Sequence, residues 1–228
     1  MSFELPIFPL GLVLFPGMPL PLHIFEPRYR TMIGRCLEED NTFGVALIVD
    51  GEEGQSDTFP AAIGCTAEIV DAQQLPDGRM NLQTVGRRRF RILSIREQDD
   101  YFIGNVEWLD DESTEEDAPI LSSQALRSLR RYLGAIGAGI ETPLQDEWNV
   151  PTEPVGVSMW IGALLAAPNA QKQQLLETNS TRERLTLEIQ LLRRAEVIQN
   201  AFVKRQSWLE PDLFDETTQN YAPFLSLN

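Results

Sequence analysis

The chain has 228 residues, 43% of them hydrophobic, which is enough apolar material for one or two domains with a packed core. Its formal net charge of -15 argues against a nucleic-acid-binding protein, because binding to phosphates relies on many cationic side chains. Two cysteines and one histidine are too few for a disulfide framework or a zinc site, so we expect no cofactor, no metal and a reducing, cytoplasmic location.

The segment from Leu5 to Phe25 is apolar, yet it cannot form one continuous helix. Its twenty-one residues contain a single ionisable side chain, His23, and are interrupted by five prolines and two glycines. Proline lacks a backbone N–H and fixes φ, so neither a transmembrane helix nor the core of a signal peptide is expected here. We predict extended, buried strands joined by turns.

One helix is predicted among these strands. Pro27 suits the first turn of a helix, and the residues after it place apolar side chains at helical spacing. The members of this stripe are Tyr29, Met32, Ile33, Cys36 and Leu37. They predict an amphipathic helix of about three turns.

A strand and a hairpin are predicted next. Residues 43–49 have the composition of a buried strand. Residues 66–73 and 80–85 flank Leu75-Pro76-Asp77-Gly78, in which proline presets one turn dihedral and glycine accepts a positive φ. This pattern predicts two antiparallel strands joined by a tight turn.

Two further strands complete the first half. In residues 86–95, Phe90 and Ile92 share one face while Arg89 and Arg91 share the other, and residues 101–109 form the last strand. Several short strands, frequent turns and a single helix predict a strongly curved sheet or partly closed barrel over residues 1–110.

Residues 111–120 carry five acidic and no basic side chains, which predicts a solvated linker between two domains. The hydrophobic period then changes from two to about 3.6, so residues 121–206 are predicted to form a bundle of helices. Thr152 is expected to cap the second helix and Ser180 the fourth, where Glu183 has the spacing of a capping box. The apolar stripe of the fourth helix comprises Leu185, Ile189, Leu192, Ala195, Ile198 and Phe202. Residues 207–228 are expected to be a tail that docks on the body or on a partner.

Five motifs in the first half carry a family resemblance. They are LPIFPL at 5–10, LFPG at 14–17, PLHIFEPRYR at 21–30, LPDG at 75–78 and GRRRFRI at 86–92. In this order and spacing the chain resembles the amino-terminal substrate-binding domain of Lon proteases, and in particular the free-standing bacterial Lon-type domains. The resemblance implies an α+β fold, in which a PUA-like pseudo β-barrel with one helix precedes a helical bundle. It also implies recognition of unfolded or tagged polypeptides rather than chemistry.

We expect no enzymatic activity from this polypeptide. The sequence has no Gly-x-x-x-x-Gly-Lys-Ser/Thr loop to cradle the phosphates of ATP, and its two lysines lie outside any motif of a Ser-Lys protease dyad. His23 has no nucleophile near it in the sequence, and Cys36 and Cys65 are interpreted as small buried hydrophobic residues. No catalytic residue is therefore assigned.

The basic cluster Arg87, Arg88, Arg89 and Arg91 is the strongest single candidate for a binding site. In so acidic a chain it suits a carboxylate, a phosphate or an acidic peptide. The favoured interpretation is nevertheless an ordinary outer sheet face paired with acids such as Asp99 and Asp100, since exposed strand charges also protect against aggregation.

The leading hypothesis is that a concave apolar surface between the curved sheet and the helices binds exposed polypeptide segments. The apolar candidates for this surface are Met18, Phe25, Tyr29, Trp108 and Trp160. Two alternatives stay open: an adaptor for a specific protease or ligase component, and a PUA-like domain that binds a small ligand or RNA. The client, the oligomeric state and the role of the tail are not specified by the sequence.

Overall fold

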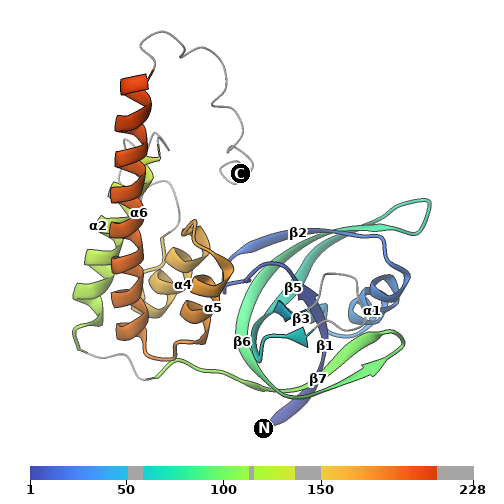
Figure 1. The fold of residues 1–228 in the computed structure, drawn as a ribbon. Helices are drawn as coiled ribbons and strands as arrows, with labels where there is room; N and C mark the ends of the chain where they lie inside the picture. Colours follow the sequence, from blue (N-terminus) through green and yellow to red (C-terminus); the bar gives the residue numbers. More distant parts are fainter. Residues whose placement is uncertain (51–58, 113–115, 137–149, 210–228) are drawn as a thin grey trace.

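A computed structural model describes residues 1–50, 59–112, 116–136 and 150–209, the last eight of them by their backbone alone. The strand-rich half contains one helix, α1 (Pro27–Glu38), and the strands β1 (Ser2–Leu10), β2 (Pro19–Ile24), β3 (Thr42–Asp50), β4 (Phe59–Pro60), β5 (Ile63–Gln74), β6 (Met80–Gln98) and β7 (Tyr101–Trp108). The helical half contains α2 (Ala118–Ala135), α4 (Pro154–Leu164), α5 (Asn169–Glu177) and α6 (Thr181–Leu209). The fold is therefore mixed α and β, with the two kinds of element largely separated along the chain and in space (Figure 1).

The strand pairings close into a ring, so the sheet is a barrel. Strand β1 pairs antiparallel with β7 and parallel with β3, and β7, β6, β5 and β3 are joined in that order by antiparallel pairings. The long strand β6 takes part in both the ring and a projecting arm, where its first residues lie between β2 and the end of β5 (Figure 1). Register shifts along β6 bend it enough to serve both.

The helix and the hairpin turn that were predicted in the strand-rich half are confirmed. Gly78 has a φ of 82° at the tip of the β5–β6 hairpin, as the Pro-Asp-Gly turn requires. Helix α1 buries Tyr29, Met32, Ile33 and Cys36 against the barrel interior, whereas Leu37 at the end of the predicted stripe is exposed. Side chains spaced three and four apart thus face the barrel together.

The helical half begins earlier than the sequence indicates. Helix α2 starts at Ala118, inside the acidic segment, and Ala118 is fully buried. Glu153, rather than Thr152, is the N-cap residue of α4, and its side chain makes no capping bond. At α6 the Glu183 N–H donates to Ser180 Oγ at 3.2 Å, which confirms one of the two predicted capping bonds.

Helix α6 buries only the first part of its predicted stripe. Leu185, Ile189 and Leu192 are buried, while Ile198 is exposed. The side chain of Phe202 and the tail after Leu209 lie outside the described residues. The packing of α6 against α2 and α4 therefore depends mainly on its amino-terminal half.

The two halves share one apolar core at their junction. Val13 and Phe15, from the loop between β1 and β2, pack among the helices rather than inside the barrel. The Phe15 ring lies so close to Gly162 of α4 that a Cβ there would stand 2.6 Å from a ring carbon. A side chain at position 162 would push the loop away, so this glycine fixes how closely the barrel approaches the helices.

Candidate functional site

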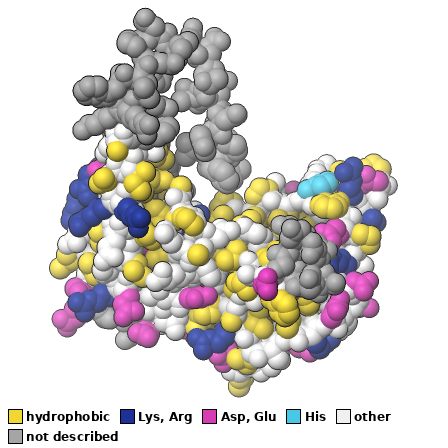
Figure 2. All heavy atoms as spheres, in the orientation of Figure 1, with side chains coloured by type: hydrophobic (Ala, Val, Ile, Leu, Met, Phe, Trp, Pro, Cys, Tyr) yellow, Lys and Arg dark blue, Asp and Glu magenta, His cyan; other side chains and the backbone are white. Residues whose placement is uncertain are grey.

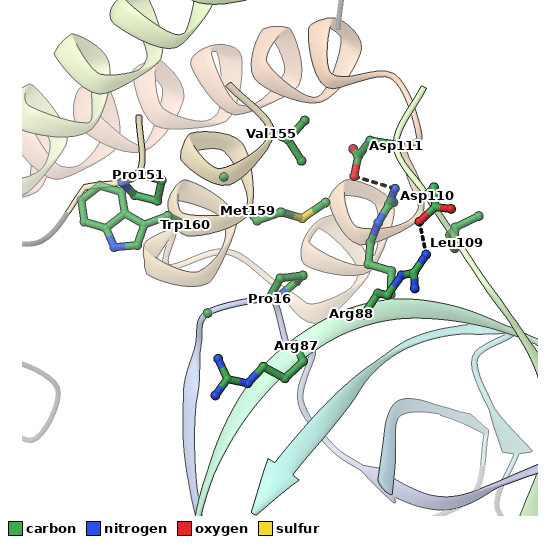
Figure 3. Close-up of a pocket in the computed structure, with 13 residues that line it drawn as sticks. Pro16, Arg87, Arg88, Leu109, Asp110, Asp111, Pro151, Val155, Met159 and Trp160 are labelled. Carbon is green, nitrogen blue, oxygen red and sulfur yellow. Dashed lines mark hydrogen bonds and ion pairs between the residues drawn. The ribbon is translucent and has the colours of Figure 1, made fainter. Parts of the chain in front are cut away.

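A cavity of about 370 Å³ opens at the junction between the barrel and the helices (Figure 3). Its apolar wall combines the loop after β1, the segment after β7 and the first two turns of α4. The apolar side chains of this wall are Pro16, Leu109, Pro151, Val155, Met159 and Trp160. We call this cavity the junction pocket; its size lies in the range of cavities that bind small molecules or single side chains.

The opposite side of the junction pocket is charged. Arg87, Arg88 and Arg89 lie side by side on β6, and Asp110 and Asp111 follow β7. Figure 3 shows Arg87 and Arg88 below α4, with Arg88 directed toward Asp110 and Arg87 directed to the other side. The pocket therefore offers both an apolar contact surface and cationic groups.

At the charged side of the pocket, Asp111 joins the barrel to α6. Its carboxylate forms ion pairs with Arg89, at 3.2 Å between Oδ2 and Nη2, and with Arg184 of α6. Arg89 also donates from Nη1 to the Leu176 carbonyl at 2.6 Å. The side chains of Arg89 and Arg184 are 2% and 0% exposed, so both cations depend on these partners. Burial lowers the pKa of Arg89 and the Asp111 carboxylate opposes that shift.

The buried chain of contacts continues from Arg184 to Glu188. Arg184 Nε donates to Ser158 Oγ at 2.7 Å, and the Ser158 hydroxyl donates to Glu188 Oε1 at 2.9 Å. Glu188 is fully buried, and burial raises its pKa well above the ordinary value, although Arg184 and the bond from Ser158 act in the opposite direction. We call Arg89, Asp111, Arg184, Ser158 and Glu188 the buried frame.

The rim of the pocket is built differently. Arg88 Nη2 and Asp110 Oδ1 form an ion pair at 2.7 Å, and the side chains are 47% and 71% exposed. The Arg88 guanidinium also lies over the Trp108 ring, 4.6 Å from its centroid. Ion pairs at such exposed positions contribute roughly 0–1 kcal/mol, so this rim pair is readily exchanged for another partner.

The predicted site residues fall into two groups. Arg87, Arg89 and Trp160 line the junction pocket together with Arg88. Trp108 lies at the rim of the pocket, where its ring contacts Arg88. Met18 is half-buried between the core of the barrel and that of the helices.

Three predicted residues lie elsewhere. Phe25, 61% exposed, follows β2 beside α1, and Tyr29 is buried in α1 against Phe8. Arg91 is exposed on β6 and is not among the residues that line the pocket.

The interpretation of Arg89 as part of an exposed sheet face is wrong, because the helical half covers that position. Asp99 pairs with Arg35 instead, at 2.6 Å. Asp110, Asp111 and Met159 were not identified from the sequence: Asp111 was assigned to a solvated linker, and Met159 lies in a helix that is apolar nearly all round. The missed signal for Asp111 is its place shortly after β7, whose neighbouring strand β6 carries a row of arginines.

The nucleophiles and the imidazole are not assembled into a reactive centre within the described residues. Cys36 and Cys65 are buried in the barrel core, and burial raises the pKa of each thiol to about 12. His23 lies exposed on the arm, its Nδ1 2.7 Å from Asn81 Oδ1, and Figure 2 shows the histidine on the side of the molecule away from the helical half. The described part of the chain contains no group of three side chains placed to hold a metal ion.

A second cavity, of about 390 Å³, lies between β3 and α5. It is lined by Leu47, Val49, Asn169, Gln173 and Glu177 among others, and no cation is among its lining residues in the described part of the chain. None of the described helices is long and apolar enough to cross a membrane.

The comparisons with known proteins point to one family. The profile described as "ATP-dependent protease La (LON) substrate-binding domain" matches residues 4–194. Among curated proteins, the Lon protease of Anaeromyxobacter dehalogenans is 26% identical over 195 residues, and that of Escherichia coli strain K12 is 28% identical over 191. These alignments cover 83% and 80% of this chain but only 23% and 24% of the relatives, so the chain spans about a quarter of their length.

Two solved structures are similar in fold. The Lon N-terminal domain protein of Xanthomonas campestris aligns with a TM-score of 0.60 at 28% identity, covering 81% of this chain and 95% of that one. The N-terminal domain of the Mycobacterium avium complex Lon protease aligns with a TM-score of 0.67 at 21% identity, covering 83% and 98%. The region matched by the family profile, residues 4–194, includes both the barrel and the helices that enclose the junction pocket.

Proposed function

The chain belongs to the family of LON substrate-binding domains, and from that premise we propose that it recognises unfolded or tagged polypeptide segments and holds an apolar side chain of the segment in the junction pocket. The proposal includes a PUA-like barrel joined to a helical bundle, a cytoplasmic location and no catalysis of its own. The match is confined to the substrate-binding domain of Lon proteases, which supports binding as the role.

The observation that carries the proposal is the composition of the junction pocket. Six apolar side chains from three separate segments converge on one cavity of about 370 Å³, and Val155 and Trp160 remain partly exposed there. Burying apolar surface releases about 25 cal/mol per Å², and tryptophan is among the residues that dominate binding energy at interfaces. A hydrophobic side chain of an unfolded segment would gain this free energy, whereas a folded protein keeps such side chains inside.

The groups outside the pocket support recognition over chemistry. A nucleophilic thiol must ionise, and the two buried thiols have pKa values of about 12. His23 has Asn81 and Arg79 as its neighbours, and neither is a nucleophile.

Binding of a fluorescently labelled unfolded polypeptide, followed by anisotropy, tests this function. Trp160→Ala removes the largest apolar side chain of the pocket wall and is expected to weaken binding about tenfold or more. Phe25→Ala is the matched control, because Phe25 is an exposed aromatic residue outside the pocket, and it is expected to leave binding unchanged. Equal losses in both variants, or equal binding of a folded control protein, would contradict the proposal.

The adaptor and small-ligand alternatives predict different outcomes. An adaptor would return one stoichiometric partner on co-purification and would not bind unfolded chains of unrelated sequence. A small-molecule ligand would raise the melting temperature at concentrations above its Kd, since a ligand that binds only the native state must stabilise it.

A further inference from the structure

We propose that the junction pocket selects segments in which a carboxylate neighbours the apolar side chain, and that Arg88 is the residue that binds this carboxylate. The inference rests on the proposed function, since it names the class of polypeptide that the same pocket accepts. The chemistry concerned is an aspartate, a glutamate or a terminal carboxylate beside an aliphatic or aromatic residue.

The three adjacent arginines of β6 differ in how deeply their ion pairs are buried. Arg89 is committed to the buried frame and is not accessible to a ligand. Arg87 pairs with Glu68, and Arg88 with Asp110, through side chains that are about half exposed. Of the cations in the described part of the pocket lining, Arg87 and Arg88 are therefore the two whose partners a ligand can replace at small cost.

Arg88 is the better placed of the two. Its guanidinium lies over the Trp108 ring and Figure 3 shows it directed toward Asp110, whereas Arg87 is directed away from Asp110 and Asp111. A guanidinium carries five N–H donors in a planar fork that suits a carboxylate, and stacking on an aromatic ring fixes the plane of that fork. Such preorganisation lowers the entropy lost when a ligand carboxylate binds.

Asp110 already demonstrates the contact that a ligand would make. Its carboxylate sits 2.7 Å from Arg88 Nη2, yet its side chain is 71% exposed and it lies in the short segment after β7. A carboxylate of a bound segment would replace Asp110 on Arg88 while its apolar neighbour enters the wall formed by Val155, Met159 and Trp160. Asp110 thus acts as an internal competitor.

The charge of the whole chain favours a single carboxylate over a polyanion. The formal net charge is -15, so a chain of phosphates is repelled at long range. Among the described residues, three cations line the pocket, and one of them is buried in the frame. RNA binding relies on several accessible cations and is an outcome that the test must distinguish.

The test compares two peptides that differ only in charge. Both carry one central tryptophan; in the first it is flanked by aspartates and in the second by asparagines, and binding is measured by anisotropy at low and high salt. We expect the wild-type protein to bind the aspartate peptide about three- to tenfold more tightly, with the difference shrinking at high salt. Arg88→Gln should abolish the preference and Asp110→Asn should increase it.

Arg91→Gln is the matched control, since Arg91 is exposed on the same strand but does not line the pocket. It should keep the preference. Each variant is first checked for an unchanged melting temperature, as expected for side chains that are about half exposed.

Three outcomes would overturn the inference. Equal affinity for the two peptides, or equal effects of Arg88→Gln and Arg91→Gln, would contradict the role of Arg88 and leave the proposed function standing. Displacement of the aspartate peptide by single-stranded RNA through Arg88 would reassign the ligand. Failure of both peptides and of an unfolded polypeptide to bind would remove the proposed function together with the inference.

Discussion

Arg88 and Arg89 are neighbours on one strand, but they belong to regions with opposite properties. Arg89 is part of the buried frame, where two cations share Asp111 away from solvent, whereas Arg88 belongs to the rim, where its pair with Asp110 is exposed. Removing one partner of a buried pair leaves an uncompensated charge, while exposed pairs contribute little to stability. The frame therefore contributes, beside the apolar core of the junction, to holding the barrel and the helices together, and the rim is available for a ligand.

The largest expected effect on stability comes from a substitution in the buried frame. Asp111→Ala leaves Arg89 and Arg184 without their shared carboxylate and should lower the free energy of unfolding by about 3–5 kcal/mol. Chemical denaturation followed by circular dichroism measures this. A loss no larger than that of Asp110→Ala would show that the frame and the rim do not differ.

A smaller loss of unfolding free energy is expected from a substitution at Ser158, in the middle of the buried frame. Ser158→Ala removes the hydroxyl that accepts from Arg184 and donates to Glu188, leaving two buried polar groups without that partner. An unmet buried hydrogen bond costs about 1–3 kcal/mol, so denaturation should show a loss in this range. Ser123→Ala, at an exposed position of α2, is the matched control and should have little effect.

The pH dependence of stability tests the charge state of Glu188. Its pKa is raised in the folded protein, so above about pH 4.3, the value of a free glutamate, the folded state holds a proton that the unfolded state has released. The contribution of Glu188 to the free energy of unfolding is therefore largest below that pH. As the pH rises from there to the folded pKa, this contribution falls by about 1.4 kcal/mol per pH unit. The free energy of unfolding, measured by denaturation at a series of pH values, should fall with pH more steeply in the wild type than in Glu188→Gln over this range. Equal slopes in the two proteins would contradict the raised pKa.

The smallest expected effect on stability belongs to the rim. Asp110→Asn removes one half of an exposed pair and should change the free energy of unfolding by no more than about 0.5 kcal/mol, measured by the same denaturation. A loss of several kcal/mol would mean that the rim pair holds the two halves together and is not exchangeable.

The sequence predicts the barrel better than it predicts the junction. The apolar stripe of α1, which follows Pro27, and the β5–β6 turn, which contains Gly78, each depend on residues within one short segment. The spacing of residues within each segment is therefore enough to indicate its structure. Strand alternation indicates which side chains of β6 share a face, but it does not reveal what covers each face.

The junction depends on contacts between residues far apart in the chain. The burial of Arg89 requires the Asp111 carboxylate and the Leu176 carbonyl, and that of Phe15 requires α4, so no local period marks either residue. An acidic run also resembles a solvated linker, and Asp111 shows that one of its members can be a structural anchor. A cavity does lie between the sheet and the helices, where an apolar binding surface was predicted, but two of its five charged lining residues, Asp110 and Asp111, were not identified.

Hydrogen–deuterium exchange of the whole chain, with and without an unfolded polypeptide, tests the central claim most directly. If the junction pocket is the binding site, added polypeptide should slow exchange in α4 and at residues 109–111, while the β5–β6 hairpin of the arm exchanges as before. Slower exchange confined to the arm, or no change anywhere in the presence of saturating polypeptide, would contradict the account.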